Sequence, residues 1–146
     1  MTKEKKFIDI QFRIIKIHTV KFCFEDYSKE YIDKLFKGKD ALELKIKTSQ
    51  VIDKETLIVT IDINTVLRDI HEEKYLVEHT GRTSYQLKGI DNFYDEKTKA
   101  YKIPNKLQEE LYQHAYEHTR ALLATELRQT PFQDKYFLPV IDQQML

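Results

Sequence analysis

The alternation of apolar and polar residues over the first 90 positions most constrains what this chain can fold into. Apolar side chains stand at every second position in segment 42–46 and again in segment 57–63. Residues two apart share one face of a strand, whereas a helix brings together residues three or four apart. The pattern therefore predicts strands with one buried face.

Two further segments extend this pattern. Between Ile8 and Phe24 the apolar residues favour even positions, but Ile15 and Ile17 fall on the opposite parity. We expect a bulge there, or cover on both faces. A fourth strand is predicted over segment 74–87. The links between the strands are short and carry no long helix. Within the predicted loop 26–40, segment 31–36 allows one helical turn. Segment 67–73 is charged and is predicted to connect the third and fourth strands. Antiparallel pairing is favoured.

A long helix follows the strands. Pro104 and Asn105 open it, and Asn105 with Gln108 forms a capping-box pattern, with Glu109 and Glu110 expected in the first turn. Pro131 ends the helical pattern. Its apolar residues form two stripes, the first with Leu107, Leu111, Ala115, His118 and Leu122, the second with Tyr112, Tyr116, Leu123 and Leu127. The order predicts a single α+β domain over 1–146, a four-stranded antiparallel sheet followed by a long α-helix.

Composition excludes several function classes. Lys and Arg total 24 and so do Asp and Glu, which argues against a dedicated nucleic-acid binder and eases self-association. The single cysteine, Cys23, allows no disulfide within the chain and fits a reducing compartment, with a structural role expected. The first ten residues lack the apolar stretch of a signal peptide, and no run is long enough for a membrane span. We expect a cytoplasmic protein without membrane insertion.

The histidines do not form a catalytic or metal-binding motif. His114 and His118 are four residues apart on the predicted helix, but no Glu follows the first and no third ligand is near. His18, His71 and His79 lack partners at a catalytic spacing. We expect no enzyme, no metal and no cofactor, while a small enzyme with a histidine site assembled in space stays a lesser alternative.

The aromatic tail after the helix is the strongest candidate for a binding surface. Phe132, Tyr136, Phe137 and Leu138 lie between two prolines in a predicted loop. Loops run over the surface, so these side chains either fold back on the core or line a groove for extended apolar peptide. Both interpretations stay open at this point.

Several segments together match a known family. The stretch 75–90 is similar to a fourth strand and turn, and 17–25, which ends in Phe24-Glu25, is similar to an N-terminal strand of that family. Pro104-Asn105, Arg120, Phe132 and Pro139-Val140 follow in matching order. In this order and spacing, the chain resembles the SecB family of protein-export chaperones over most of its length.

The resemblance implies a fold, an activity and partners. Members are α+β subunits that form homotetramers, as dimers of dimers packed through the long helices. They are ATP-independent holdases that bind unfolded or pre-export polypeptides and deliver them to the motor SecA for translocation. The residues that match the docking face for SecA are Glu25, Leu76 and Glu78, and we expect Phe132, Tyr136, Phe137 and Leu138 to contribute to the peptide groove.

The chain also departs from the family's pattern. Lys21 stands where the family has a second acid on the first strand, and the neutral net charge contrasts with acidic members. The loop before the helix is longer, and the sequence ends at Leu146 where the family continues into a second helix. These departures leave two alternatives: a SecB-like chaperone dedicated to one client, such as an antitoxin, or an adaptor of the same fold without client binding.

Overall fold

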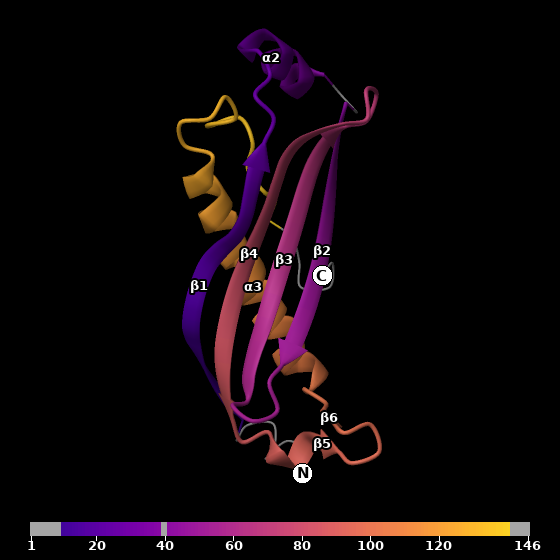
Figure 1. The fold of residues 1–146 in the computed structure, drawn as a ribbon, viewed down its shortest axis with the longest axis vertical. Helices are drawn as coiled ribbons and strands as arrows, with labels where there is room; N and C mark the ends of the chain where they lie inside the picture. The colour runs from indigo at the N-terminus through magenta and orange to yellow at the C-terminus, as the bar shows by residue number, and fades with distance from the viewer. Residues whose placement is uncertain (1–9, 39–40, 141–146) are drawn as a thin grey trace.

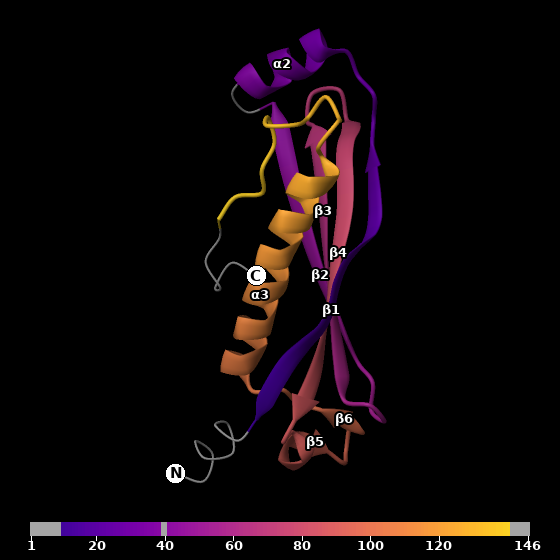
Figure 2. The same ribbon diagram turned by 90° about the vertical axis from the view of Figure 1, so that its left-hand side faces the viewer.

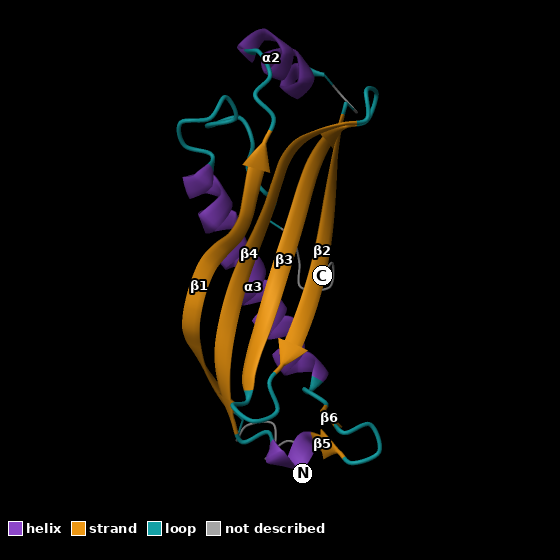
Figure 3. Ribbon diagram, in the orientation of Figure 1, coloured by secondary structure: helices purple, strands orange, loops and turns teal. Residues whose placement is uncertain are grey.

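The computed structural model describes residues 10–38 and 41–140, and its fold has two layers (Figures 1 and 3). Ile8 and the tail beyond Val140 lie outside the described residues. The elements in chain order are β1 (Gln11–Phe24), α2 (Lys29–Lys37), β2 (Leu42–Ile52), β3 (Ile58–Asp69), β4 (Lys74–Lys88), a 3-10 turn (Asp91–Phe93), β5 (Tyr94–Asp95), β6 (Ala100–Tyr101) and α3 (Asn105–Glu126).

Four long strands form one sheet in the order β1-β4-β3-β2, with every neighbouring pair antiparallel. Helix α3 lies diagonally across one face of this sheet, while no described element covers the other face (Figure 2). Helix α2 lies across one end of the sheet, and the short β5–β6 hairpin lies at the opposite end (Figure 1). The predicted fold class, a four-stranded antiparallel sheet followed by a long helix, is confirmed.

The core lies between the sheet and α3. Burial alternates along β3 and β4, so that every second side chain, such as Ile61, Ile63 and Tyr85, is completely buried under the helix. Each fully buried large apolar side chain contributes roughly 1.5–3 kcal/mol to folding. The Tyr85 hydroxyl donates a hydrogen bond to the Leu111 carbonyl at 2.9 Å, which satisfies this polar atom within the core.

Gly81 sets how closely α3 approaches the sheet. A Cβ atom at this position would lie 2.5 Å from Oγ1 and 3.1 Å from Cβ of Thr119. A side chain larger than hydrogen would therefore collide with the Thr119 side chain unless that side chain or the helix shifted. The missing side chain at Gly81 therefore leaves the space that Thr119 of α3 occupies against the strand.

Two bulges explain the broken alternation of β1. Its register against β4 shifts between Ile14 and Lys16 and again between Thr19 and Lys21. Each extra residue reverses the parity of those that follow, so that Ile17 shares the helix side of the sheet with Phe12 and Phe22 although their parities differ. The expected bulge is confirmed, and a second one restores the original parity.

Two predicted connecting segments differ from the structure. Strand β3 continues to Asp69, so the predicted connection 67–73 is reduced to a tight turn, because Asp69 is held by the Tyr31 hydroxyl at 2.6 Å. The expected helical turn within 26–40 is the full helix α2.

The capping box at Asn105 is wrong. Pro104 occupies the cap position and makes no side-chain cap hydrogen bond, while the Gln108 amide donates to the Pro104 carbonyl at 2.9 Å. Asn105 is therefore already inside the helix, and Glu109 and Glu110 fall in its second turn. The buried face of α3 draws on both predicted stripes, and it also includes Thr119.

Candidate functional site

The segment after α3 turns back and runs beside the helix (Figure 2). Two helix side chains hold its backbone: the Tyr116 hydroxyl donates to the Pro139 carbonyl at 2.6 Å, and Arg120 Nε donates to the Leu138 carbonyl at 3.0 Å. A second Arg120 nitrogen binds Glu117 at 2.8 Å, which fixes the guanidinium on the helix. Because these bonds go to carbonyls, the side chains of the segment are left to pack or to face solvent.

A hollow with both apolar and charged walls lies between α3 and this returning segment. It has a volume of about 310 Å³. We call it the tail hollow, and it is lined by Glu117, Arg120, Ala121, Leu123, Ala124, Tyr136, Phe137 and Leu138. On the α3 side, Ala121 and Ala124 line the hollow with small side chains, which leaves its space open. Phe137 is 61% exposed, so it presents most of its ring to solvent at the rim.

The four predicted groove residues have different positions. Tyr136, Phe137 and Leu138 line the tail hollow, but Tyr136 and Leu138 are buried within the chain. Phe132 is fully buried elsewhere, with its ring centroid 6.4 Å from that of Phe24 and 6.3 Å from that of Phe36. Folding back and exposure therefore both occur in this tail, and the role of the four in peptide binding stays a prediction.

The three predicted docking residues come together at the end of β1. Glu25, Leu76 and Glu78 line one hollow of about 170 Å³, and the Glu25 amide donates to the Leu76 carbonyl at 3.0 Å. Leu76 is fully buried, whereas Glu25 is exposed.

Glu78 is already engaged within the chain. Asn64 donates to it at 3.0 Å and the Lys21 ammonium lies 3.1 Å away, and both lower the pKa of its carboxyl, Asn64 first. The ion pair with Lys21 partly neutralises the acid that would meet a basic partner.

The free edge of β1 carries unusual apolar exposure. Ile14, Ile15, Ile17 and Val20 are each 39–46% exposed. Strand β1 pairs with β4 on one side only, and no described strand pairs with its outer edge. An edge with unpaired backbone groups and apolar side chains is a template for another strand.

The sequence analysis did not predict that a group of polar residues is buried between the helix and the sheet. Thr65, His79, Thr83 and Thr119 are buried between apolar layers. His79 Nε2 lies 2.9 Å from Thr19 Oγ1, and burial lowers the pKa of His79 to about 4. Thr65, His79 and Thr83 occupy the alternate positions of β3 and β4 that face the helix. This alternation in the sequence could have predicted that they are buried.

The structure does not assemble the two helix histidines into a ligand set. His118 Nδ1 lies 3.0 Å from Thr83 Oγ1, and the His114 ring lies 5.9 Å from the Phe12 ring. Across residues 10–38 and 41–140, no group of three His, Cys, Asp or Glu side chains is placed to hold a metal ion. Within the same residues, no helix has both the length and the apolar character that crossing a bilayer requires.

Comparison with known proteins yields structural matches alone. No model of a known protein family matches the chain, and no curated protein matches its sequence. Among solved structures, Mycobacterium tuberculosis Rv1957, a SecB-like chaperone in complex with a ChAD peptide from the Rv1956 HigA1 antitoxin, aligns with a TM-score of 0.55. The alignment covers 90% of this chain and 91% of Rv1957, at 9% sequence identity.

The fold is SecB-like. A protein of unknown function from Streptococcus agalactiae aligns with a TM-score of 0.45 at 9% identity, over 89% of this chain and 98% of that one. At 9% identity the match to Rv1957 concerns the arrangement of strands and helix, and this arrangement agrees with the fold that the resemblance to the SecB family implied.

Proposed function

We propose that this chain is an ATP-independent holdase chaperone that binds non-native polypeptide, without catalysis and without a cofactor. The observation that carries the proposal is the tail hollow, in which apolar side chains including the exposed Phe137 lie beside Glu117 and Arg120, on a SecB-like fold. The matched SecB-like chaperone Rv1957 was solved with an antitoxin peptide, which supports polypeptide as the client class.

The physical properties of the tail hollow suit a client of variable sequence. Burial of apolar surface is non-directional and contributes roughly 25 cal/mol per Å², so it accepts many sequences. Tyr116 and Arg120 hold the segment by its backbone carbonyls, which leaves the Phe137 ring free to contact an extended chain. The small side chains of Ala121 and Ala124 leave room for client side chains against the helix.

The chain has two surfaces through which copies of it could assemble. We place the chaperone in the cytoplasm as a homotetramer, a dimer of dimers, with the exposed β1 edge and the outward face of α3 as contacts. The β1 edge exposes Ile14, Ile15, Ile17 and Val20, so a contact between subunits there would remove apolar surface from water.

A dedicated client is favoured over delivery to SecA for export. Glu78 is already paired with Lys21, and the Leu76 side chain is buried. Of the three predicted docking residues, Glu25 is therefore the one that remains accessible to a basic partner. An antitoxin-like polypeptide is the client that fits this proposal, because the peptide in the Rv1957 complex comes from an antitoxin.

The test is suppression of aggregation, followed by light scattering of a chemically denatured client protein without ATP. The wild-type chain is expected to suppress scattering. Phe137→Ser is expected to weaken client affinity about tenfold, because a largely exposed Phe contributes about 1–2 kcal/mol when buried. The control is Val51→Ser, since Val51 is 67% exposed and lies on the opposite face of the sheet. If the wild-type chain does not suppress aggregation, the adaptor alternative is supported. If Phe137→Ser and Val51→Ser lose suppression equally, the tail hollow is not the client-binding site.

A further inference from the structure

The uncovered face of the sheet is strongly basic although the chain is neutral. Strand register places the even-numbered residues of β4, from Glu78 to Lys88, on this outer face together with their partners on β1 and β3. The basic side chains on it are Arg13, Lys16, Lys21, Lys45, Lys47, Arg68, Arg82 and Lys88, and the acidic ones are Glu43, Asp62 and Glu78. Eight cations against three acids leave an excess of five positive charges on one face.

The acids are each already paired across strands. Arg82 binds Asp62 at 2.7 Å and Lys21 binds Glu78 at 3.1 Å. Glu43 lies within 4 Å of both Lys45 and Arg68. Among the described residues, no ion pair includes Arg13, Lys16, Lys47 or Lys88, so the positive charge of this face is not neutralised from within.

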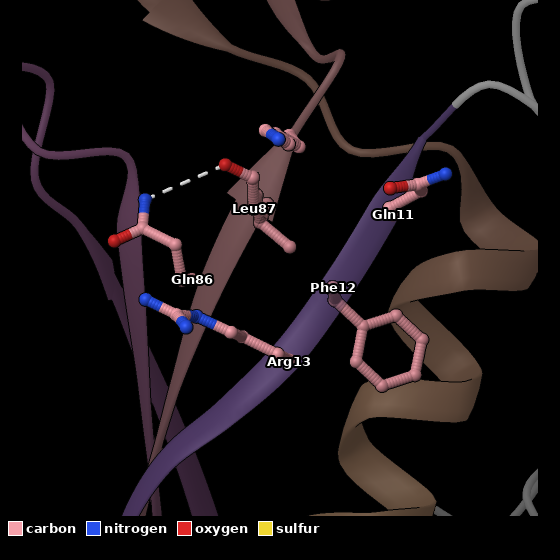
Figure 4. A pocket seen from close by; sticks show the side chains of 6 residues that line it. Gln11, Phe12, Arg13, Gln86 and Leu87 are labelled. Carbon is pink, nitrogen blue, oxygen red and sulfur yellow. Dashed lines mark hydrogen bonds between the residues drawn. The ribbon is translucent and has the colours of Figure 1, made fainter.

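Two of these cations meet at a hollow where β1 begins and β4 ends. It has a volume of about 450 Å³ and is lined by Gln11, Phe12, Arg13, Gln86, Leu87 and Lys88 (Figure 4). The Gln86 amide donates to the Thr56 carbonyl at 2.6 Å and to the Leu87 carbonyl at 3.4 Å. Arg13, Lys88 and Gln11 therefore supply the donors that remain in this hollow, whereas Phe12 points toward α3 (Figure 4).

We infer that the outer face of the sheet is a docking surface for an acidic polypeptide segment, with one of its carboxylates in the hollow at Arg13 and Lys88. Guanidinium and ammonium groups with an amide donor match a carboxylate in charge and hydrogen bonding. The surface lies on the opposite side of the sheet from the tail hollow, so it goes beyond the proposed holdase function.

Two observations favour polypeptide over nucleic acid. Glu43, Asp62 and Glu78 are interspersed with the cations, and these acids would repel a continuous phosphate backbone while tolerating a peptide with spaced charges. Among the strand residues on this face, the aromatic side chain is that of Tyr75 at one end, so no row of rings is available for base stacking.

The test uses the full chain and a fluorescein-labelled peptide of about twelve residues in which Glu alternates with Ser, so that its carboxylates are spaced. At about 3.3 Å a residue this peptide matches the 14-residue β1 in length. Binding is followed by fluorescence anisotropy at low salt. The double variant Arg13→Glu/Lys88→Glu is expected to weaken binding about tenfold or more. The matched control, Lys97→Glu/Lys106→Glu, carries the same charge change away from the face and is expected to change binding less than about twofold.

Each outcome decides the inference. Binding that weakens with added salt and is lost in the face variant alone supports it, provided that suppression of client aggregation is unchanged in that variant. The inference is overturned if the alternating Glu-Ser peptide does not bind the wild type, or if both double variants weaken binding equally. It is also overturned if a labelled oligothymidylate of equal charge binds more tightly than the peptide, because the face would then be a nucleic-acid surface.

Discussion

The buried imidazole of His79 is expected to make the free energy of unfolding depend on pH in mildly acidic solution. The residue is fully buried, and its Nε2 lies 2.9 Å from Thr19 Oγ1, while Nδ1 has no hydrogen-bond partner among the described residues. A charged imidazolium there would lose its hydration and leave one N–H unpaired. Burial therefore lowers the pKa of His79 from 6.5 to about 4.

The sign and size of the effect follow from this pKa. Between pH 6.5 and pH 4 the unfolded chain binds a proton at His79 that the folded chain does not, so the folded state loses stability as the pH falls. One pKa unit corresponds to about 1.4 kcal/mol, so His79 is expected to cost about 2 kcal/mol at pH 5 and about 3 kcal/mol at pH 4, relative to pH 7. Above about pH 7.5 its contribution is constant, because the imidazole is then neutral in both states.

Urea denaturation at pH 7, 6 and 5 measures this loss. In His79→Leu the buried site no longer titrates, so its free energy of unfolding is expected to fall about 2 kcal/mol less between pH 7 and pH 5 than that of the wild type. Val51→Ser, which changes an exposed side chain without a titratable group, serves as the control and is expected to keep the wild-type slope. If wild type and His79→Leu lose stability in parallel, His79 is not the group responsible and the reasoning fails.

Two further predictions concern α3 and its neighbours. Gly81→Ala is expected to destabilise the fold by about 1–3 kcal/mol in urea, because its Cβ would meet Thr119 Oγ1 at 2.5 Å; adding Thr119→Ala should restore part of this, and no recovery would argue against the clash. Tyr116→Phe removes the hydrogen bond to the Pro139 carbonyl, at a cost of about 1 kcal/mol, and should speed chymotrypsin cleavage after Phe137; an unchanged cleavage rate would show that Arg120 holds the segment alone.

Periodicity predicted the strands and the long helix because these elements repeat one contact many times. It could not place the end of β3, where Asp69 is buried. The Tyr31 hydroxyl and the amides of His71 and Glu72 satisfy this carboxylate, and sequence order does not show that α2 brings Tyr31 there. The sequence pattern around Asp69 therefore predicts a connecting segment where the structure has the end of a strand.

The tail illustrates a second limit. Phe132, Tyr136, Phe137 and Leu138 are all apolar in character, but a loop has no fixed period that assigns its side chains to inside or outside. The Arg120 bond to the Leu138 carbonyl sets the turn that leaves Phe137 at the rim, and Phe132 instead packs near α2. The basic face of the sheet was equally hidden, because its charges come from four strands and share a side only through their register.

The sheet order β1-β4-β3-β2 also has a consequence for synthesis of the chain. Strands β2, β3 and β4 form consecutive hairpins, whereas the partner of β1 among the described strands is β4. The first residue of β4 that pairs with β1, Val77, follows Phe24 by about 50 residues. At translation rates of about 5–20 residues per second, β1 waits roughly 3–10 s for its partner. During that interval its isoleucines and phenylalanines are unpaired on the nascent chain, so a protein proposed to hold unfolded clients is itself such a client while it is being made.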